Sequence, residues 1–260
     1  MRVIAVKDYE EMSDRAAEIV LAAVEEDPRI VLGLATGSSP VGLYQRMAAA
    51  CKDGLDFSQV VTFNLDEYVG LAPDHDQSYR YFMNENLFNH INIRPENTHV
   101  PDGLSDALLT TCAEYEMMIE EAGGIDIQVL GIGRDGHLAF NEPGTSLASR
   151  THVTELTEET IADNARFFEK PEDVPRFAVT MGLATILDAG QLLFVANGEG
   201  KADAVAGALE GPVTSSNTGS AMQLHPDVVA IVDEGAASKL RRVDFYIWQE
   251  RNRHLIADKL

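Results

Sequence analysis

Residues 125–144 have the sequence IDIQVLGIGRDGHLAFNEPG, an apolar run followed by a glycine-rich loop. The run Ile125–Leu130 is typical of a buried strand. The closely spaced glycines after it let the backbone turn sharply and approach a ligand. Among and just beyond them stand three titratable side chains, Asp135, His137 and Glu142. Ligands of open α/β sheets bind at the carboxyl ends of strands, so we expect a functional site in this loop.

Three other interpretations of this loop compete with a catalytic site. Its glycines match the G-x-G-x-x-G of a dinucleotide site, with Glu155 near the expected acidic position, but residues 141–144 (Asn-Glu-Pro-Gly) break the helix that this motif requires. A purely structural role for His137 is less favoured, because two carboxylates share the loop. A metal site on Asp135, His137 and Glu142 is supported by no further cluster with ligand spacing, so we predict no metal.

The chain is strongly acidic, with a net charge of −22 over 260 residues, of which 45% are hydrophobic. Such a surface repels nucleic acid and anionic membranes, and we expect neither as a partner. The two cysteines, Cys51 and Cys112, form no CxxC pair, which favours reduced thiols. Residues 1–7 lack a signal-peptide pattern, and no apolar run is long enough to span a membrane. We therefore expect a cytoplasmic protein.

Strands and helices alternate along the sequence. We expect strands at 3–6, 30–34, 60–65, 125–130, 151–156, 177–181, 192–196 and 228–232, and helices at 8–26, 41–52, 78–88, 105–121, 158–168, 183–188, 200–210 and 234–240. This alternation indicates an α/β fold with a mostly parallel sheet and helices on both faces. We predict a single domain over residues 1–260, in which 241–260 form a charged tail carrying Phe245, Tyr246 and Trp248.

The segment Thr36-Gly-Ser-Ser-Pro40 lies between a predicted strand and a predicted helix. Backbone N–H groups, hydroxyls and a helix N-terminus there suit a phosphate. An ordinary turn, with Ser39 as the N-cap and Pro40 at the first helical position, explains the segment equally well. Lys201 supplies a cation after another strand, although such a lysine alone is more often a solvated surface residue.

The segment Asn64-Leu-Asp-Glu-Tyr68 places two adjacent carboxylates at the end of a strand. Successive strand residues point to opposite faces, so one of the pair is expected to enter a cleft while the other supports it. A partly buried Asp66 is suited to act as a general base with a raised pKa. The alternative is a turn acid that caps the next segment.

Six segments together resemble the glucosamine-6-phosphate deaminase family: LATGSSP (34–40), FNLDEYVGL (63–71), GIGRDGHLAFNEPG (131–144), NARFF (164–168), TMG (180–182) and LHP (224–226). The Asp-Gly-His core alone is shared with 6-phosphogluconolactonases, whereas FNEPG together with NLDEY is specific to the deaminases. The resemblance implies a modified Rossmann-like fold without a cofactor. It also implies conversion of glucosamine 6-phosphate and water to fructose 6-phosphate and ammonia.

The resemblance also implies roles for individual residues. Asp66 is expected to move a proton between C2 and C1 of the sugar. His137 is expected to assist ring opening, with Asp135 and Glu142 orienting it and setting its charge. The substrate phosphate is expected on four residues, Ser38, Ser39, Arg166 and Lys201. Two other functions remain open, a 6-phosphogluconolactonase-type hydrolase and a sugar-phosphate sensor without turnover.

The sequence departs from the family pattern at Arg134, often Asn in relatives, and at Ser216–Ala221, which lacks the usual Pro-Ala-Ser. The family includes monomers and hexamers. The aromatic residues of the tail are expected to be buried in a subunit interface, because exposed apolar patches often mark contact surfaces. We therefore predict a homo-oligomer, with a hexamer as one candidate. In hexameric relatives N-acetylglucosamine 6-phosphate activates from a second phosphate site. The matching positions here are Thr145, His152 and Thr154, which carry no fixed positive charge, so we expect little activation.

Overall fold

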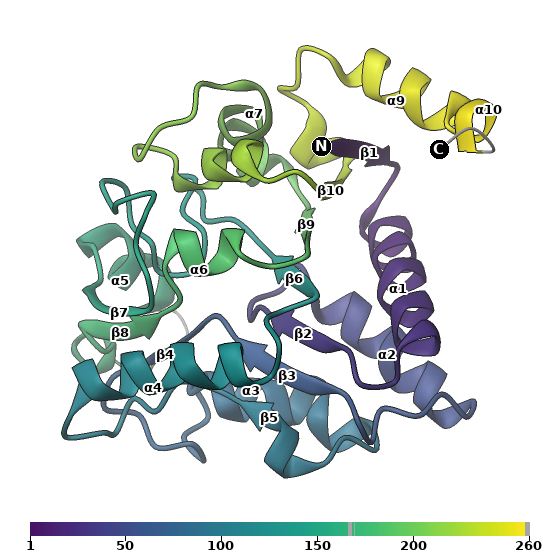
Figure 1. Ribbon diagram of the computed structural model, residues 1–260. Coiled ribbons are helices and arrows are strands. Elements are labelled where there is room, and N and C mark those ends of the chain that lie inside the picture. The colour runs from purple at the N-terminus through teal and green to yellow at the C-terminus, as the bar shows by residue number, and fades with distance from the viewer. Residues whose placement is uncertain (166–167, 169, 258–260) are drawn as a thin grey trace.

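A seven-stranded parallel sheet forms the centre of the computed structural model, which describes residues 1–165, 168 and 170–257 (Figure 1). Its strands lie in the order β1-β10-β9-β6-β2-β3-β5. Their bounds are Arg2–Val6 (β1), Val31–Leu34 (β2), Val61–Asn64 (β3), Thr98–His99 (β5), Ile127–Leu130 (β6), Gln191–Ala196 (β9) and Val228–Asp233 (β10). The predicted α/β fold with a mostly parallel sheet is thus confirmed. The two-residue strand β5 was not predicted.

Helices cover both faces of this sheet. Strand residues alternate between two hydrophobic cores, as in β6, where Val129 joins one core and Leu130 the other. One core is closed by α1 (Tyr9–Glu26), α2 (Val41–Lys52) and α3 (Tyr79–Asn86). The other is closed by α4 (Leu108–Glu121), α6 (Leu183–Leu187), α7 (Ala202–Glu210) and α8 (Glu234–Ala237).

Helix α1 shows how local sequence sets these elements. Asp8 caps its N-terminus and accepts a hydrogen bond from Glu11 N at 3.0 Å. Residues four apart, Met12, Ala16, Val20 and Val24, are all buried and form the stripe that packs on the sheet. The predicted capping signal and apolar period therefore define the helix and its buried face.

A second, three-stranded sheet lies beside the main one in the order β4-β8-β7 (Figure 1). Its strands β4 (Asp66–Tyr68), β8 (Phe177–Thr180) and β7 (His152–Glu155) pair antiparallel. β4 follows β3 after a single residue, Leu65. The sequence predicted β7 and β8 as strands but did not predict this separate sheet, because β4 is a three-residue strand without a hydrophobic pattern of its own.

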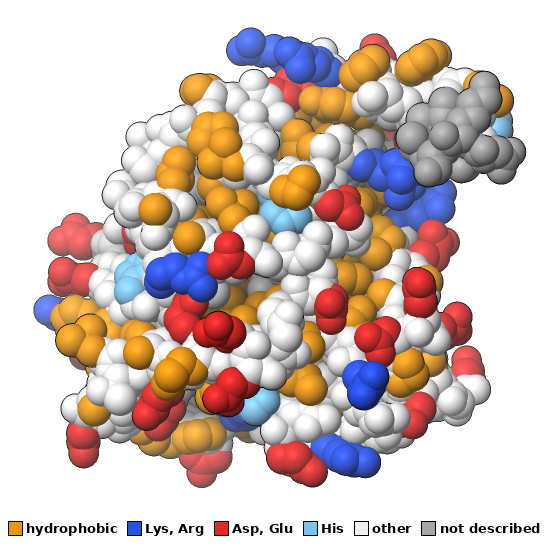
Figure 2. Space-filling model, in the orientation of Figure 1, with side chains coloured by type: hydrophobic (Ala, Val, Ile, Leu, Met, Phe, Trp, Pro, Cys, Tyr) orange, Lys and Arg blue, Asp and Glu red, His pale blue; other side chains and the backbone are white. Residues whose placement is uncertain are grey.

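The C-terminal tail forms helices α9 (Val243–Asn252) and α10 (His254–Ala257) where only a charged tail was predicted. Arg2 Nε donates to Glu250 Oε2 at 2.8 Å, which ties α9 to β1. Acidic side chains are scattered over the face shown in Figure 2, while basic ones gather near these helices. None of the helices described has the length and apolar character needed to cross a membrane.

Candidate active site

The carboxyl ends of β2, β3, β6 and β9 surround a cavity of about 720 Å³. Six of the eight predicted site residues line it: Ser38, Ser39, Asp66, Asp135, His137 and Lys201. Glu142 lies behind His137 and is buried. Arg166 lies outside the described residues. The structure thus brings seven of the predicted residues together from four separate segments of the chain.

The loop 36–40 forms one side of the cavity, in front of α2. The hydroxyl of Tyr9 donates to the backbone oxygen of Ser38 at 3.0 Å and accepts from Gly42 N at 2.7 Å. Ser39 Oγ donates to Asn197 Oδ1 at 2.7 Å. The alternative in which Ser39 caps α2 is not what the structure has, because Pro40 takes the N-cap position and Ser39 Oγ donates to Asn197. The loop therefore presents its backbone and two hydroxyls to the cavity.

Lys201 brings a positive charge to the same cavity. It closes the short helix η5 (Glu199–Lys201), directly after β9 and before α7. Its Nζ donates to Ile132 O at 2.7 Å, which fixes the ammonium beside the glycine-rich loop. An ammonium that lines the same cavity as Ser38 and Ser39 suits a phosphate.

Asp66 and Glu67 have different surroundings although they are adjacent in β4. Asp66 is buried and lines the cavity. Burial, then the charge of Glu67, raise the pKa of Asp66 to about 8, and the opposing effect of His137 is smaller. Glu67 instead accepts from Tyr68 N at 2.8 Å and from Tyr79 N and Arg80 N at 3.0 Å. One carboxylate thus faces the cavity while the other caps the start of α3.

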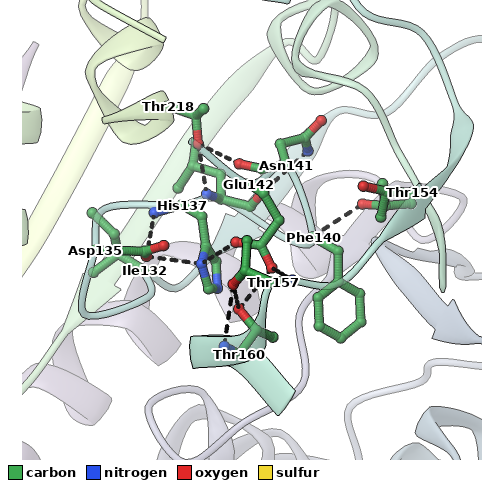
Figure 3. Close-up of polar contacts among 12 residues, drawn as sticks. Ile132, Asp135, His137, Phe140, Asn141, Glu142, Thr154, Thr157, Thr160 and Thr218 are labelled. Atoms are coloured by element: carbon green, nitrogen blue, oxygen red, sulfur yellow. Dashed lines mark hydrogen bonds and ion pairs between the residues drawn. The ribbon is translucent and has the colours of Figure 1, made fainter. Parts of the chain in front are cut away.

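The imidazole of His137 lies between two carboxylates (Figure 3). Its Nδ1 is 2.8 Å from Asp135 Oδ1 and 3.5 Å from Glu142 Oε2. Burial disfavours the imidazolium, but Asp135 and Glu142 outweigh it and raise the pKa of His137 to about 9. Burial alone would raise the pKa of Asp135 and of Glu142. The contacts of each carboxyl, first among them those with His137, outweigh it, so both pKa values are lowered. The geometry therefore holds a protonated imidazole at neutral pH.

Glu142 is itself held in place by hydroxyl and amide donors. Its Oε1 accepts from Thr160 Oγ1 at 2.6 Å and from Thr157 N at 3.4 Å (Figure 3). Thr157 is the N-cap of α5 (Glu158–Asn164), so the start of this helix is tied to the glycine-rich loop through Glu142. No sequence pattern indicated these two threonines, because they are separated from Glu142 along the chain.

The loop does not have the geometry of a dinucleotide site. No helix begins at Gly136 in this described part of the chain, and Leu138 and Asn141 instead form an isolated antiparallel bridge. One ligand atom from each of Asp135, His137 and Glu142 lies within 4.8 Å of the others, close enough to hold a metal ion. A protonated imidazole is no ligand, so this grouping favours an ion-paired histidine near neutral pH.

Aromatic side chains that the sequence analysis did not single out form another wall of the cavity. Tyr68, Tyr79, Phe140 and Phe168 all line it. The rings of Tyr79 and Phe140 stack at 5.8 Å between centroids, and Tyr68 lies 5.4 Å from Phe140. They come from β4, α3 and two loops, so no spacing in the sequence could have grouped them.

Comparison with known proteins agrees with this fold. The family model of glucosamine-6-phosphate isomerases/6-phosphogluconolactonase matches residues 7–229, and the chain belongs to this family. The glucosamine-6-phosphate deaminase of Clostridioides difficile (strain 630) is 54% identical over 246 residues, covering 94% of this chain and 99% of that protein. That of Hahella chejuensis is 50% identical over 249 residues, covering 95% of each.

Solved structures show the same relationship. A structure described as a monomeric glucosamine-6-phosphate deaminase superposes with a TM-score of 0.90 at 44% identity, covering 92% of this chain and 100% of its own. The 6-phosphogluconolactonase from Trypanosoma brucei superposes with a TM-score of 0.76 at 19% identity, covering 92% and 98%. The latter likeness is one of fold alone.

Proposed function

We propose that this chain is a glucosamine-6-phosphate deaminase, an enzyme of amino-sugar catabolism. It converts glucosamine 6-phosphate and water to fructose 6-phosphate and ammonia. One observation carries the proposal: Asp66, with a pKa raised by burial, and His137, paired with two carboxylates, face one cavity with Ser38, Ser39 and Lys201. The family membership and relatives of about 50% identity with this name support it.

Binding begins with the phosphate in this proposal. Ser38, Ser39 and Lys201 receive it, together with Arg166, which the family resemblance assigns to the same group. The local cations resolve the conflict between an anionic substrate and a chain of net charge −22. Charge-assisted hydrogen bonds to phosphate are stronger than neutral ones, so this end of the substrate anchors the sugar.

Ring opening is assigned to His137. Its imidazolium gives a proton to the ring oxygen as the bond from that oxygen to C1 breaks, and the C1 hydroxyl gives its proton to solvent, so an open-chain aldehyde forms. Asp135 and Glu142 keep the imidazole oriented and charged, as their distances of 2.8 Å and 3.5 Å to Nδ1 allow. The reaction needs no external oxidant or reductant, because C1 is reduced as C2 is oxidised, and we propose that neither a metal nor a redox cofactor is needed.

The isomerisation is assigned to Asp66. Its carboxylate removes the proton from C2, giving an enolamine, and the same group returns a proton to C1. The product is an imine at C2, which water hydrolyses to the ketone with release of ammonia. A base with a raised pKa suits this step, because it both accepts and returns a proton near neutral pH.

The two alternative functions fit less well. A lactonase opens an ester with water and has no need for a base that moves a proton between two carbons, whereas Asp66 is buried and faces the cavity. The lactonase structures near 20% identity share the fold only. A sensor without turnover gives no reason to keep an acid–base pair in the binding cavity.

The deciding experiment incubates the purified chain with glucosamine 6-phosphate and measures ammonia and fructose 6-phosphate. A parallel reaction with 6-phosphogluconolactone tests the hydrolase. We expect equal amounts of ammonia and fructose 6-phosphate, and Asp66→Asn as the inactive control. Lactone hydrolysis without deamination would identify the chain as a hydrolase instead. Tight binding of the sugar phosphate without turnover would identify it as a sensor.

We further propose a cytoplasmic homo-oligomer, a hexamer being one candidate, built from one domain over residues 1–260. Phe245 and Trp248 on α9 stack on each other and are 50% and 61% exposed, an apolar surface that self-association would cover. Light scattering should find a mass above 28.4 kDa, reduced by Phe245→Ser with Trp248→Ser. A mass of 28.4 kDa would show instead that the chain is a monomer, like the monomeric deaminase to which it is similar.

A further inference from the structure

A tight turn connects the two ends of the histidine–carboxylate group. It runs from Leu138 to Asn141, between His137 and Glu142, and Asn141 N donates to Leu138 O at 3.0 Å. Ala139 in this turn has φ +52°, the only positive φ of a non-glycine residue in the described chain. A residue with a Cβ adopts this conformation only when its surroundings enforce it.

Thr218 provides much of that enforcement. Its hydroxyl oxygen accepts from Leu138 N at 3.1 Å and donates to Asn141 O at 2.9 Å, so one side chain joins both ends of the turn (Figure 3). Thr218 is completely buried and begins the short helix η6 (Thr218–Leu224). It lies in the segment 216–221, where the sequence departs from the family pattern.

The backbone around Thr218 strengthens the same contact. Gly219 N donates to Gly136 O at 2.8 Å, and Gly144 N donates to Ser215 O at 2.8 Å. The segment 215–219 is therefore hydrogen-bonded to the glycine-rich loop on both sides of the turn. Two side chains reach the turn itself: Thr180 Oγ1 accepts from Phe140 N at 3.2 Å, whereas Thr218 alone of the two bonds to both Leu138 and Asn141, and a substitution can remove its hydroxyl.

We propose that Thr218 is a positioning residue of the deaminase site, whose hydroxyl fixes the turn that sets the separation of His137 and Glu142. The inference rests on the proposed function. Without the hydroxyl, Leu138 N and Asn141 O lose a buried partner, and Ala139 is released toward ordinary backbone conformations. Glu142 then moves relative to the imidazole, from which its Oε2 now lies 3.5 Å away.

The substrate-binding groups are not part of this contact. Ser38, Ser39 and Lys201 belong to other segments and keep their own hydrogen bonds, to Tyr9, Asn197 and Ile132 respectively. Loss of the Thr218 hydroxyl should therefore act on turnover rather than on phosphate binding. Since a displacement near 1 Å of a catalytic group can cost about a hundredfold in rate, we expect kcat to fall about ten- to hundredfold.

The test compares Thr218→Val, which keeps the shape and removes the hydroxyl, with Thr218→Ser, which keeps the hydroxyl. Thr62→Val is the matched control, because Thr62 is buried in β3 and its hydroxyl has no partner among the described residues. kcat, KM and the pH profile are measured for deamination, together with melting temperature. If Thr218→Val does not fold, Thr218→Ala, which adds no bulk, replaces it.

We expect Thr218→Val to lower kcat, to leave KM close to wild type, and to shift the alkaline fall in activity to lower pH. The shift follows because a more distant Glu142 stabilises the imidazolium less. Thr218→Ser should restore all three. A kcat and pH profile matching those of Thr62→Val would overturn the proposal, and so would a lower kcat with an unchanged alkaline limb. A wild-type chain that forms no fructose 6-phosphate would instead refute the proposed function.

Discussion

The carboxyl groups of Asp66 and Glu67 are adjacent in β4, yet one faces the cavity and the other is bound by three backbone N–H groups. Burial raises the pKa of Glu67, and these three N–H groups act against that rise. Burial and this neighbour together raise the pKa of Asp66 to about 8. The strand thus places the proposed base and a group that adjusts its proton affinity on successive residues.

The first prediction concerns the acid limb of activity. Asp66 must be ionised to remove the C2 proton, so kcat/KM should rise with pH through about 8 in the free enzyme. Asp66→Asn should bind substrate but lose turnover by a factor on the order of 10² or more. Steady-state kinetics of both proteins from pH 6 to 10 test this. Near-normal activity of the variant would remove Asp66 from the mechanism.

The same variant has a predictable effect on stability. The folded-state pKa of Asp66 lies above its unfolded value, so its contribution to stability is complete below the unfolded pKa and is lost as pH rises through about 8. Asp66→Asn carries no charge at any pH. Its melting temperature should therefore exceed that of the wild type at pH 9 and approach it at pH 5.

His137 sets the alkaline limb in the second prediction. Its pKa of about 9 means that the imidazolium is lost as pH rises through that value, and ring opening should slow there. Together with Asp66, this gives an optimum between about pH 8 and 9. His137→Gln cannot titrate, so its lower activity should lack the alkaline fall. An unchanged alkaline limb in that variant would assign the limb to another group.

Lys201 is the subject of the third prediction. Lys201→Ala should raise KM strongly, because a hydrogen bond to a charged group contributes roughly 1.5–3 kcal/mol, or about ten- to a hundredfold in affinity. Arg166→Ala should act in the same way. Lys239→Ala is the matched control, since Lys239 pairs with the exposed Asp203 at 2.6 Å. Unphosphorylated glucosamine should be a very poor substrate; equal rates with and without phosphate would refute the site.

The fourth prediction is that chelation does not affect the reaction. The donor atoms of Asp135, His137 and Glu142 are close enough for a metal ion, but the raised pKa of His137 keeps its nitrogen protonated near neutral pH. Prolonged dialysis against EDTA at pH 7.5 should leave kcat unchanged. Activity that disappears on dialysis and returns with Zn²⁺ would show instead that Asp135, His137 and Glu142 bind a metal ion.

Local patterns predicted the fold because the strands of the main sheet are apolar runs, as at Val228–Asp233, and α1 has both a cap and a buried stripe. The three-residue strand β4 and the two-residue β5 are too short to produce a period. Six of the predicted site residues do line one cavity, because each follows a parallel strand or its loop.

The supporting contacts could not be predicted in this way. Thr218 bonds to Leu138 across 80 positions of sequence, and Thr160 bonds to Glu142 across 18. Such pairs are created by the packing of segments, and no spacing or composition indicates them. The direction of Glu67 was equally open, because alternation along a strand tells only that Asp66 and Glu67 differ, not which one faces the cavity.

The last prediction concerns regulation by N-acetylglucosamine 6-phosphate. By the family resemblance, Thr145, His152 and Thr154 are expected to match the second phosphate site of hexameric relatives. His152 and Thr154 lie two residues apart on β7 and share one face, but neither supplies a fixed positive charge. The nearby Arg150 is engaged, because its guanidinium bonds to Glu116 at 3.0 Å and also pairs with Asp188. An effector without differential affinity for two states cannot shift them, so we expect hyperbolic kinetics and little or no activation at pH 7.5. Initial rates against glucosamine 6-phosphate, with and without the effector, test this.

Sigmoidal kinetics that become hyperbolic on its addition would show that other cations form the site. Arg150→Ala would then identify whether this guanidinium leaves its carboxylates to bind the effector.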